Sequence, residues 1–486
     1  MKYQTTIGLE VHIELKTKSK MFCSCKNDPD EKRANFNICP ICMGHPGVLP
    51  VINKEAVKKT IKTGLALNCQ ISEHSNFDRK NYFYPDLPKN YQISQLYMPF
   101  CKKGFLRINN KKIMVREVHL EEDTGKLVHP KGTDYSLVDF NRAGVPLMEL
   151  VTKPDLKSSK QARKFAEELQ LILRYLGVSD ANMEKGQMRV EANISLGKNK
   201  KLGTKVEIKN LNSFRAVERG IEYEVERQKE LLESGQKVVQ ETRGWNEIKG
   251  KTVSQRKKEE AHDYRYFPEP DLPTLHIKGD YVKKIKAEIS ELPELRRERL
   301  NREYVLDEKT IEIFVFNKSL GEYFEKVMLK LRNLVKEQAK KNEFLELTKL
   351  CSNYIISDLQ GLLKEGLADK KFLIAPEDFA KFITLIYEGK ISSKIAKIVL
   401  GEMFKTGDSS SKIIKEKRLS QITDKGEIEK IVKEVILKNK KAVQDFKKGK
   451  VQALQFLVGK AMKESRGKIE PIIVEKMLKR DIRLTK

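Results

Sequence analysis

The sequence predicts an α+β N-terminal domain around an antiparallel sheet, followed by an all-α helical domain and a small all-α tail. Three observations support this order. Short runs of alternating apolar and polar residues, typical of half-buried strands, lie before about residue 290. After that point proline becomes scarce and apolar residues recur at helical spacing. At 486 residues the chain also exceeds what one hydrophobic core supports, so several domains are expected.

The elements expected in the N-terminal region follow from local patterns. Apolar residues alternate with polar ones in "IGLEVHIEL", "KIMVREVHLEED" and "RVEANISL", which predicts three strands. Two longer segments have helical spacing, and the first of them ends at a glycine, a common helix stop. Loops rich in Pro, Asn, Asp and Gly separate these elements. The strands are expected at 7–15, 112–123 and 189–196, and the helices at 159–177 and 213–235.

The C-terminal part changes character twice. Helical spacing takes over after "ELPELRRERLNREY" (291–304), and "KTGDSSSK" (405–412) is typical of a flexible linker. Residues 411–486 hold 22 Lys and Arg against 10 Asp and Glu, nearly half of the chain's net charge of +27. We therefore expect an α+β domain at 1–290, a helical domain at 291–405 and a helical tail at 411–486.

The composition indicates a polyanionic partner. A net charge of +27 creates a field that attracts polyanions, of which nucleic acid is the expected one. A lysine-rich genome bias is the alternative explanation. No stretch reaches the roughly 18 apolar residues of a membrane span, and the N-terminus lacks the apolar core of a signal peptide. We expect a cytoplasmic protein with no membrane partner, whose seven cysteines form no disulfide framework.

Four cysteines form a compact pattern. Cys23 and Cys25 have one residue between them, and after thirteen intervening residues Cys39 and Cys42 follow with two residues between them. Such short spacings let two thiolates from one tight loop reach the same tetrahedral ion, and four sulfurs leave no position open for catalysis. The pattern therefore predicts a structural zinc site that stiffens its loop.

Carboxylates and histidines gather on the polar faces of the expected strands. Several carboxylates with an imidazole are what a divalent cation site needs, and such a cation can neutralise phosphate oxygens. The alternative is a solvated polar face of an open sheet. The residues concerned are Glu10, His12 and Glu14 on the first strand, His119, Glu121 and Asp123 on the second, and Asp139 and Glu149 in residues 138–156.

The sequence contains no phosphate-binding glycine loop. The nearest candidate, 244–252, places five residues between its glycines where four are required. A nucleotide would therefore be held by metal and by scattered basic groups.

Two loops interleave aromatic and basic residues, "DRKNYFYPDLPKNYQ" (78–92) and "DYRYFPEPDLP" (263–273). Aromatic rings among positive charges can stack on unpaired bases and grip phosphates. The alternative is a packed loop whose path is fixed by its prolines. The residues concerned are Arg79, Lys80, Tyr82, Phe83, Tyr84 and Tyr91 in the first loop, and Tyr264, Arg265, Tyr266 and Phe267 in the second.

Ten stretches together resemble the B subunits of tRNA-dependent amidotransferases, the GatB family. They run in order along nearly the whole chain and are far more specific than any single motif above. The stretches are "IGLEVHIELKTKSKMF", "PGVLPVIN", "FDRKNYFYPDLPKNYQISQ", "HLEEDTGKL", "SLVDFNRAGVPLMELV", "GTKVEIKNLNSFRAVERGIEYEVERQ", "QETRGWNE", "DYRYFPEPDLP", "GKISSKIAKIVL" and "FLVGKAMKESRGK".

The resemblance implies a cradle-shaped catalytic domain, a helical domain and a YqeY-like tail that contacts tRNA. It implies an ATP-dependent carbon–nitrogen ligase acting on misacylated Glu-tRNA(Gln), Asp-tRNA(Asn) or both. The side-chain carboxylate would be phosphorylated, and ammonia made from glutamine by a separate glutaminase A subunit would displace the phosphate. A small C subunit would complete a heterotrimer, and a non-discriminating aminoacyl-tRNA synthetase is a candidate further partner.

The resemblance also implies site residues. A catalytic Mg²⁺ or Mn²⁺ would be held by Glu10, His12, Glu121 and Glu149, and structural Zn²⁺ by Cys23, Cys25, Cys39 and Cys42. From the matching stretches we expect Lys20, Arg79 and Lys80 to bind ATP. Substrate contacts are expected from Tyr82, Tyr84, Tyr91, Asn210, Ser213 and Arg215. The rival hypothesis is a noncatalytic tRNA-binding scaffold with a structural zinc site.

Overall fold

The chain divides into two compact units, Met1–Pro293 and Glu294–Lys486. The computed structural model describes residues 3–199, 201–257, 264–334, 341–364, 374–417, 419, 425–465 and 469–484. Asp263, the first residue of the second aromatic loop, lies outside these described residues.

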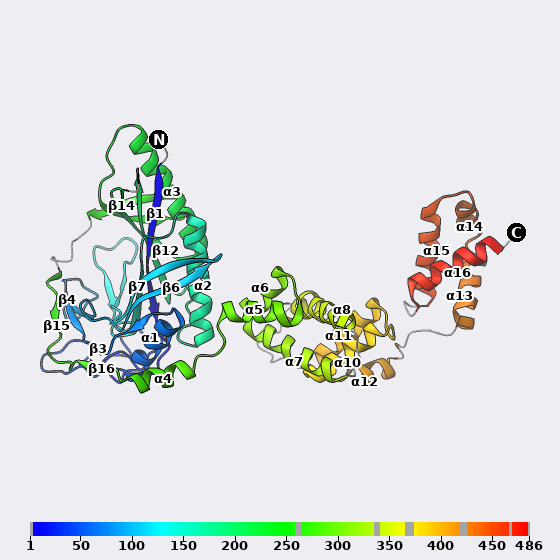
Figure 1. Cartoon of the computed structure of the whole chain (residues 1–486), viewed down its shortest axis with the longest axis horizontal. Coiled ribbons are helices and arrows are strands. Elements are labelled where there is room, and N and C mark those ends of the chain that lie inside the picture. Colours follow the sequence, from blue (N-terminus) through cyan, green and yellow to red (C-terminus); the bar gives the residue numbers. More distant parts are fainter. Residues whose placement is uncertain are drawn as a thin grey trace. The chain divides into compact units, whose positions relative to one another are not determined.

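Unit 1 is built around a nine-stranded sheet in the order β14-β13-β12-β11-β1-β10-β7-β6-β2 (Figure 1). Every neighbouring pair is antiparallel except β12 and β13, which run parallel. The long strand β1 lies in the middle, between β11 and β10. The strands are β1 Gln4–Glu14, β2 Gln70–Ile71, β6 Cys101–Ile108, β7 Lys111–Glu122, β10 Pro146–Thr152, β11 Met188–Gly197, β12 Val206–Leu211, β13 Glu241–Asn246 and β14 Lys251–Lys257.

Apolar alternation fixes which face of this sheet is covered. Leu9, Val11 and Ile13 of β1 are at most 1% exposed and share one core with apolar residues of the helices. Side-chain oxygens of Asn53, Ser158 and Ser213 cap the N-termini of the three long helices of unit 1. These helices are α1 Lys54–Ala66, α2 Ser159–Leu176 and α3 Phe214–Glu233, and the shorter α4 spans Gly279–Ala287.

The predicted strands and helices of unit 1 are confirmed within two residues at each end, apart from β1, which begins at Gln4 rather than Ile7. Because even-numbered residues of β1 point away from the helix-covered face, Glu10, His12 and Glu14 lie on the opposite face.

Three small sheets join loops of unit 1. One of them pairs the first aromatic loop with the second, because β15 lies beside β4. The strands are β4 Asp78–Asn81, β5 Tyr91–Ser94 and β15 Phe267–Pro268 in this sheet, β3 His74–Ser75 with β16 Leu275–His276, and β8 Lys126–Val128 with β9 Leu137–Asp139.

Unit 2 is helical throughout its described residues, so the predicted order of an α+β part followed by all-α parts is confirmed. The last four helices share a hydrophobic core of their own, which includes Val432, Leu457 and Leu478. The helices are α5 Pro293–Tyr304, α6 Glu308–Phe316, α7 Lys318–Leu334, α8 Lys341–Asn353, a π-helix Tyr354–Leu359, α9 Gln360–Lys364, α10 Pro376–Tyr387, α11 Ser393–Thr406, α12 Ser410–Glu416, α13 Lys425–Lys438, α14 Lys440–Lys447, α15 Val451–Glu464 and α16 Pro471–Leu484.

The segment predicted as a flexible linker is partly helical, which corrects that prediction. Gly407, with φ +76°, ends α11, and the Ser409 hydroxyl caps α12, which begins at Ser410. Helix α12 packs against α10 and α11. A serine-rich run resembles a linker in composition, but here one of its serines is an N-cap.

Among the described residues, no helix is both long enough and apolar enough to cross a membrane.

Candidate functional site

The registers of three central strands place a row of polar side chains on the face of the sheet that the helices do not cover. We call this face the open face. His12 of β1 lies opposite Glu149 of β10, and Glu149 lies opposite His119 of β7. Glu121 is two residues beyond His119 and therefore on the same face of β7. Residues from three separate parts of the sequence thus meet in one place.

The distances within this row are short. His12 Nε2 lies 3.4 Å from Glu149 Oε2 and 3.8 Å from Glu121 Oε1. His119 Nε2 lies 3.2 Å from Glu149 Oε2 and 3.9 Å from Glu121 Oε2. One potential ligand atom each from His12, Glu121 and Glu149 lies within 4.8 Å of the others. We call these three residues the cation group.

The charges in the cation group support each other. Burial opposes charging of His12, but Glu149 and Glu121 outweigh burial and raise the pKa of His12 to about 9. Burial also acts on Glu149, yet His119 and His12 outweigh it and hold the pKa of this carboxyl well below its usual range. For Glu121, burial and the neighbouring Glu149 raise the pKa. The closely spaced carboxylates of Glu121 and Glu149 are therefore stabilised by positive charge placed near them.

The donor set fits a divalent cation. Two carboxylate oxygens and one imidazole nitrogen this close together can reach one ion at about 2.1 Å. Carboxylates suit Mg²⁺ and Mn²⁺, and an imidazole ligand favours transition metals over Mg²⁺. Three protein ligands leave further coordination positions for phosphate oxygens and water, so the group is suited to phosphoryl chemistry.

Lys80 of β4 adds a positive charge beside the cation group. Its ammonium lies 4.9 Å from the ring centroid of Tyr264 and 5.9 Å from that of Tyr82. Burial opposes this charge, but Tyr266 and the carboxylates of Glu121 and Glu149 outweigh it and raise the pKa of Lys80. The predicted nucleotide-binding lysine therefore lies close enough to Glu121 and Glu149 for their charges to act on it, and its ammonium lies near two tyrosine rings.

Glu10 lies on the same strand face but belongs to a neighbouring group. It is opposite Glu191 of β11, and its carboxylate groups with those of Glu191 and Glu207. Asn193 Nδ2 donates to Glu10 Oε1 at 2.7 Å, and Lys209 Nζ lies 3.1 Å from Glu191. Of the four predicted cation ligands, the structure thus brings three together. Glu10, on the same strand as His12, instead groups with carboxylates of β11 and β12.

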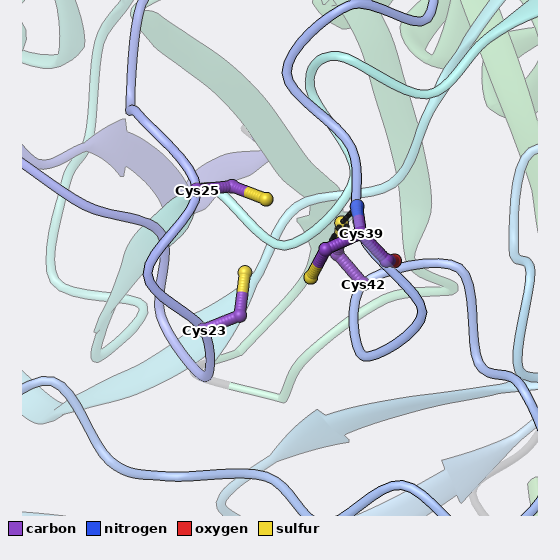
Figure 2. A group of neighbouring side chains, drawn as sticks. All are labelled: Cys23, Cys25, Cys39 and Cys42. Atoms are coloured by element: carbon purple, nitrogen blue, oxygen red, sulfur yellow. Dashed lines mark hydrogen bonds between the residues drawn. The ribbon is translucent and has the colours of Figure 1, made fainter.

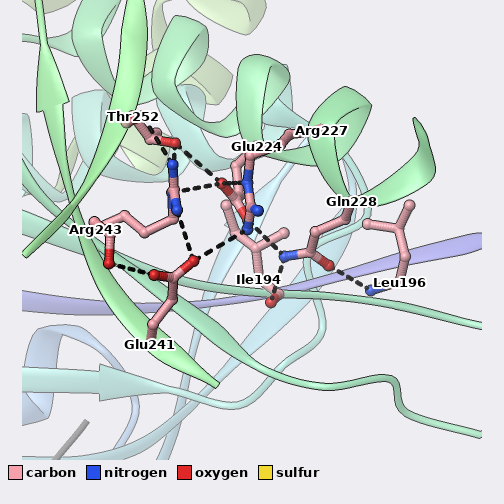
Figure 3. A network of polar contacts seen from close by, with 9 residues as sticks. Ile194, Leu196, Glu224, Arg227, Gln228, Glu241, Arg243 and Thr252 are labelled. Carbon is pink, nitrogen blue, oxygen red and sulfur yellow. Dashed lines mark hydrogen bonds and ion pairs between the residues drawn. The ribbon is translucent and has the colours of Figure 1, made fainter. Parts of the chain in front are cut away.

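A buried polar network holds the edge strands next to Glu207. Glu224 of α3 accepts from Arg227 and Thr252, and Arg243 donates to Thr252 and Glu241 (Figure 3). The network ties α3 to β13 and β14. On β13, the Thr242 hydroxyl also donates to Glu207 at 2.7 Å. Glu207, one of the three carboxylates in the group with Glu10 and Glu191, is therefore held in place by its contact with β13.

The four cysteines meet as their spacing predicts. Cys23 and Cys25 come from one loop and Cys39 and Cys42 from another, and their thiols face a common space (Figure 2). All four sulfurs lie within 4.8 Å of one another, and those of Cys39 and Cys42 are 3.9 Å apart. Sulfurs at about 2.3 Å from a tetrahedral ion lie roughly 3.8 Å apart. The group therefore fits a structural zinc ion.

Lys20 and Arg79 lie differently from the nucleotide-binding residues predicted. The Lys20 side chain is 0% exposed, and its ammonium contacts Cys42 rather than the open sheet face. The Arg79 guanidinium donates to both carboxylate oxygens of Glu269, at 2.7 and 2.8 Å, and lies over the ring of Tyr91. Arg79 thus clamps the two aromatic loops together, a pairing that propensity alone does not reveal.

The predicted substrate residues are spread over two regions. Tyr82 lies beside Lys80, Tyr84 is 56% exposed, and Tyr91 packs under Arg79. Asn210 and Arg215 are exposed, and Asn210 adopts a left-handed backbone conformation with φ +63°. The Ser213 hydroxyl accepts from Ala216 N as the N-cap of α3.

Sequence reasoning missed the partners of Glu10 and the direct contact of His119. Glu191 and Glu207 both lie on strands, but alternation does not say which strands are neighbours in a sheet. His119 lies on the predicted polar face and among the residues considered for a cation site, yet the pattern does not predict its contact with Glu149. The missing signal in both cases is strand order, which depends on distant parts of the chain.

Comparisons with known proteins cover nearly the whole chain. Residues 5–283 match the family described as the GatB/GatE catalytic domain, and residues 333–482 match the GatB domain. The B subunit of the aspartyl/glutamyl-tRNA(Asn/Gln) amidotransferase of Caldicellulosiruptor saccharolyticus is 47% identical over 492 residues. The proteins of the same name from Carboxydothermus hydrogenoformans and Thermotoga maritima are each 46% identical. Each alignment covers 98% or 99% of this chain and of the relative.

Proposed function

The chain belongs to the family of aspartyl/glutamyl-tRNA(Asn/Gln) amidotransferase B subunits, and we propose that it carries out the ATP-dependent amidation of misacylated tRNA. Glu-tRNA(Gln), Asp-tRNA(Asn) or both would become Gln-tRNA(Gln) and Asn-tRNA(Asn), with glutamine as the amide donor. The observation that carries this proposal is the cation group with Lys80 beside it, on the open face of the sheet.

The first step activates the side-chain carboxylate of the aminoacyl group. One carboxylate oxygen attacks the γ-phosphorus of ATP, the bond to the bridging oxygen breaks, and ADP leaves behind an acyl phosphate. Two anions must approach each other, so fixed positive charge lowers the barrier. Lys80 supplies such a charge. Glu121, Glu149 and neutral His12 would hold a divalent cation, which neutralises phosphate oxygens when bound.

The second step forms the amide. The nitrogen of ammonia attacks the acyl carbon, the bond to the phosphate oxygen breaks, and the nitrogen loses a proton. The acyl phosphate must be protected from water until ammonia arrives. Tyr82, Tyr264 and Tyr266 would contribute to this protection, because their rings line the space around the Lys80 ammonium.

We propose that the last four helices bind the body of the tRNA. Lys438, Lys440, Lys441 and Lys450 line a groove of about 840 Å³, together with the ring of Phe456, which is 51% exposed. Lysines contact phosphates without regard to sequence, and an exposed ring can stack on an unpaired base. These contacts would position the tRNA while the chemistry takes place in unit 1.

Family membership supports further components. A glutaminase A subunit would supply ammonia, a small C subunit would complete the heterotrimer, and a non-discriminating aminoacyl-tRNA synthetase would deliver the substrate. The cysteine group would hold structural Zn²⁺. A role in protein biosynthesis fits a cytoplasmic enzyme.

The experiment that tests this proposal separates it from a noncatalytic tRNA-binding scaffold. The chain is assembled with its partner subunits, and ADP and amide formation are measured with and without misacylated tRNA. We expect ATP hydrolysis that depends on misacylated tRNA and is lost in Glu149→Gln, while tRNA binding persists. ADP formation that is unchanged in this variant would favour the scaffold.

A further inference from the structure

Lys20 is a positive charge buried against the cysteine group. Its side chain is 0% exposed, although lysine is rarely buried without a partner. The ammonium lies 3.7 Å from Cys42 Sγ and 3.3 Å from the carbonyl oxygen of Phe140. Among the described residues, no carboxylate forms an ion pair with it, and the nearby Glu122 is paired with Lys89 at 2.5 Å. The charge of Lys20 is therefore matched only by whatever charge the cysteine group carries.

The charge of the cysteine group depends on its metal. Four thiolates around one divalent ion carry a net charge of −2. A buried charge without a counter-charge is strongly unfavourable. The buried ammonium therefore matches the metal-loaded state of the cysteines.

We propose that Lys20 is the charge partner of the metal–thiolate group, bound to it through an N–H···S hydrogen bond to Cys42. This inference rests on the proposed zinc site. Lys20 is then a positioning residue that acts on the metal through a ligand, and not a nucleotide-binding residue.

Lys20 also connects the cysteine loops to the strand that carries Glu149. Its backbone N–H donates to Cys25 O at 2.9 Å, and the next residue, Met21, donates from its N–H to Gly144 O at 2.7 Å. Residues 140–145 lead directly into β10. Gly144 has φ +83°, and a Cβ built on it would lie 3.4 Å from Cys42 Cβ and 3.6 Å from Lys20 Cδ. Lys20 and Met21 thus contact both the cysteine loops and the segment that leads into β10.

The first test compares Lys20→Met with Lys18→Met in the full chain. Methionine keeps most of the length of lysine and removes its charge, and Lys18 is an exposed lysine two residues away. Zinc release to a chromogenic chelator should be about 10- to 100-fold faster in Lys20→Met, as is typical when a partner of a metal ligand is lost. Release from Lys18→Met should equal that of the unmodified chain. Equal release from both variants would overturn the inference.

A spectroscopic readout separates a charge partner from a packing residue. With Co²⁺ in place of zinc, the thiolate-to-cobalt charge-transfer band should move to longer wavelength in Lys20→Met, because the thiolate loses a hydrogen bond and a nearby positive charge. An unchanged band would contradict the proposal. Failure of the unmodified chain to bind zinc or Co²⁺ would instead reject the zinc site itself, so the two failures are distinguishable.

A measurement on the unmodified chain covers the case in which Lys20→Met does not fold. Lysine acetylation is followed by mass spectrometry before and after zinc is removed with a chelator. Lys20 should be protected in the zinc-loaded chain and become reactive once zinc is removed, while Lys18 reacts in both states. Protection of Lys20 that does not change on zinc removal would contradict the proposal.

Discussion

The cysteine group and the cation group of unit 1 are built in opposite ways. All four cysteines lie within twenty residues of sequence, on two neighbouring loops, and together they close a tetrahedral site. The cation group takes one residue from each of three strands, at positions 12, 121 and 149, and leaves coordination positions open. A structural metal can be held by loops because its ligands are also what orders them. A catalytic cation needs ligands on elements that are rigid before it binds.

The difference teaches how far each site depends on the rest of the fold. The ligands of the cysteine group all come from two loops close together in the sequence, and Lys20 is buried against them. The cation group requires the correct order and register of β1, β10 and β7, because a shift of one residue would turn Glu149 to the opposite face. We therefore expect changes in the cysteine group to affect stability first, and changes in the cation group to affect the reaction first.

The largest effect should come from removing charge in the cation group. We expect Glu149→Gln to lower amide formation by at least about 100-fold in the assembled enzyme, the scale of losing one stabilising group at a reacting centre. Glu10→Gln should cost less, because Glu10 belongs to the neighbouring group with Glu191. Glu226→Gln, a change of an exposed glutamate on α3, is the matched control and should be nearly neutral. Equal losses for Glu10→Gln and Glu149→Gln would show that the two groups act as one.

The second-largest effect is expected from a change in the cysteine group. Cys39→Ser removes one of four sulfurs, so the chain should lose its content of about one zinc and unfold at lower temperature. The rate of amide formation per folded molecule should stay within about threefold, because no cysteine contacts the cation group. Metal analysis and thermal unfolding of the purified chain check this prediction. Full stability without bound metal would contradict it.

The sequence predicts these two sites unequally, for a physical reason. Paired spacings determine which cysteines meet, and all four do so. Alternation identifies the polar strand faces that hold His12 and Glu121, and the family resemblance adds Glu149, together with Glu10, which the structure places in the neighbouring group. Neither alternation nor resemblance shows that Glu10 pairs with Glu191, that Lys20 is buried against Cys42, or that Arg79 clamps Glu269. These contacts depend on strand order and loop packing, which are set by residues more than a hundred positions away in most cases.

A third change separates binding from chemistry. Because α12 packs against α10 and α11, the chain should be truncated after Lys417 rather than within the serine-rich segment before it. We expect tRNA affinity to fall about tenfold or more and its dependence on salt to become shallower, because phosphate contacts are lost. Raising the tRNA concentration should recover much of the amidation rate. Filter binding over a salt series checks this, and an unchanged affinity and salt slope would contradict it.

The smallest effect concerns Glu14, the third acidic residue on the polar face of β1. Burial and the nearby Asp123 outweigh Arg189 and Arg142 and raise the pKa of Glu14 from 4.5 to about 7. A carboxyl whose pKa is raised by folding stabilises the fold below its unfolded pKa and loses this contribution as pH rises through the folded pKa. The free energy of unfolding should therefore fall between about pH 4.5 and pH 7. In Glu14→Gln this part of the pH dependence should be absent.

The most direct test of the central claim is equilibrium binding of Mn²⁺, followed by electron paramagnetic resonance in the zinc-loaded chain. Occupied cysteines leave two groups among the described residues for added Mn²⁺, the cation group and the neighbouring carboxylates of Glu10, Glu191 and Glu207, and we expect the tight site to be the cation group. We predict one tight site in the unmodified chain and in the control Glu226→Gln, and at least about tenfold weaker binding in both Glu149→Gln and Glu121→Gln. Mn²⁺ binding of equal strength in all four proteins would contradict the assignment of His12, Glu121 and Glu149 as the catalytic cation site.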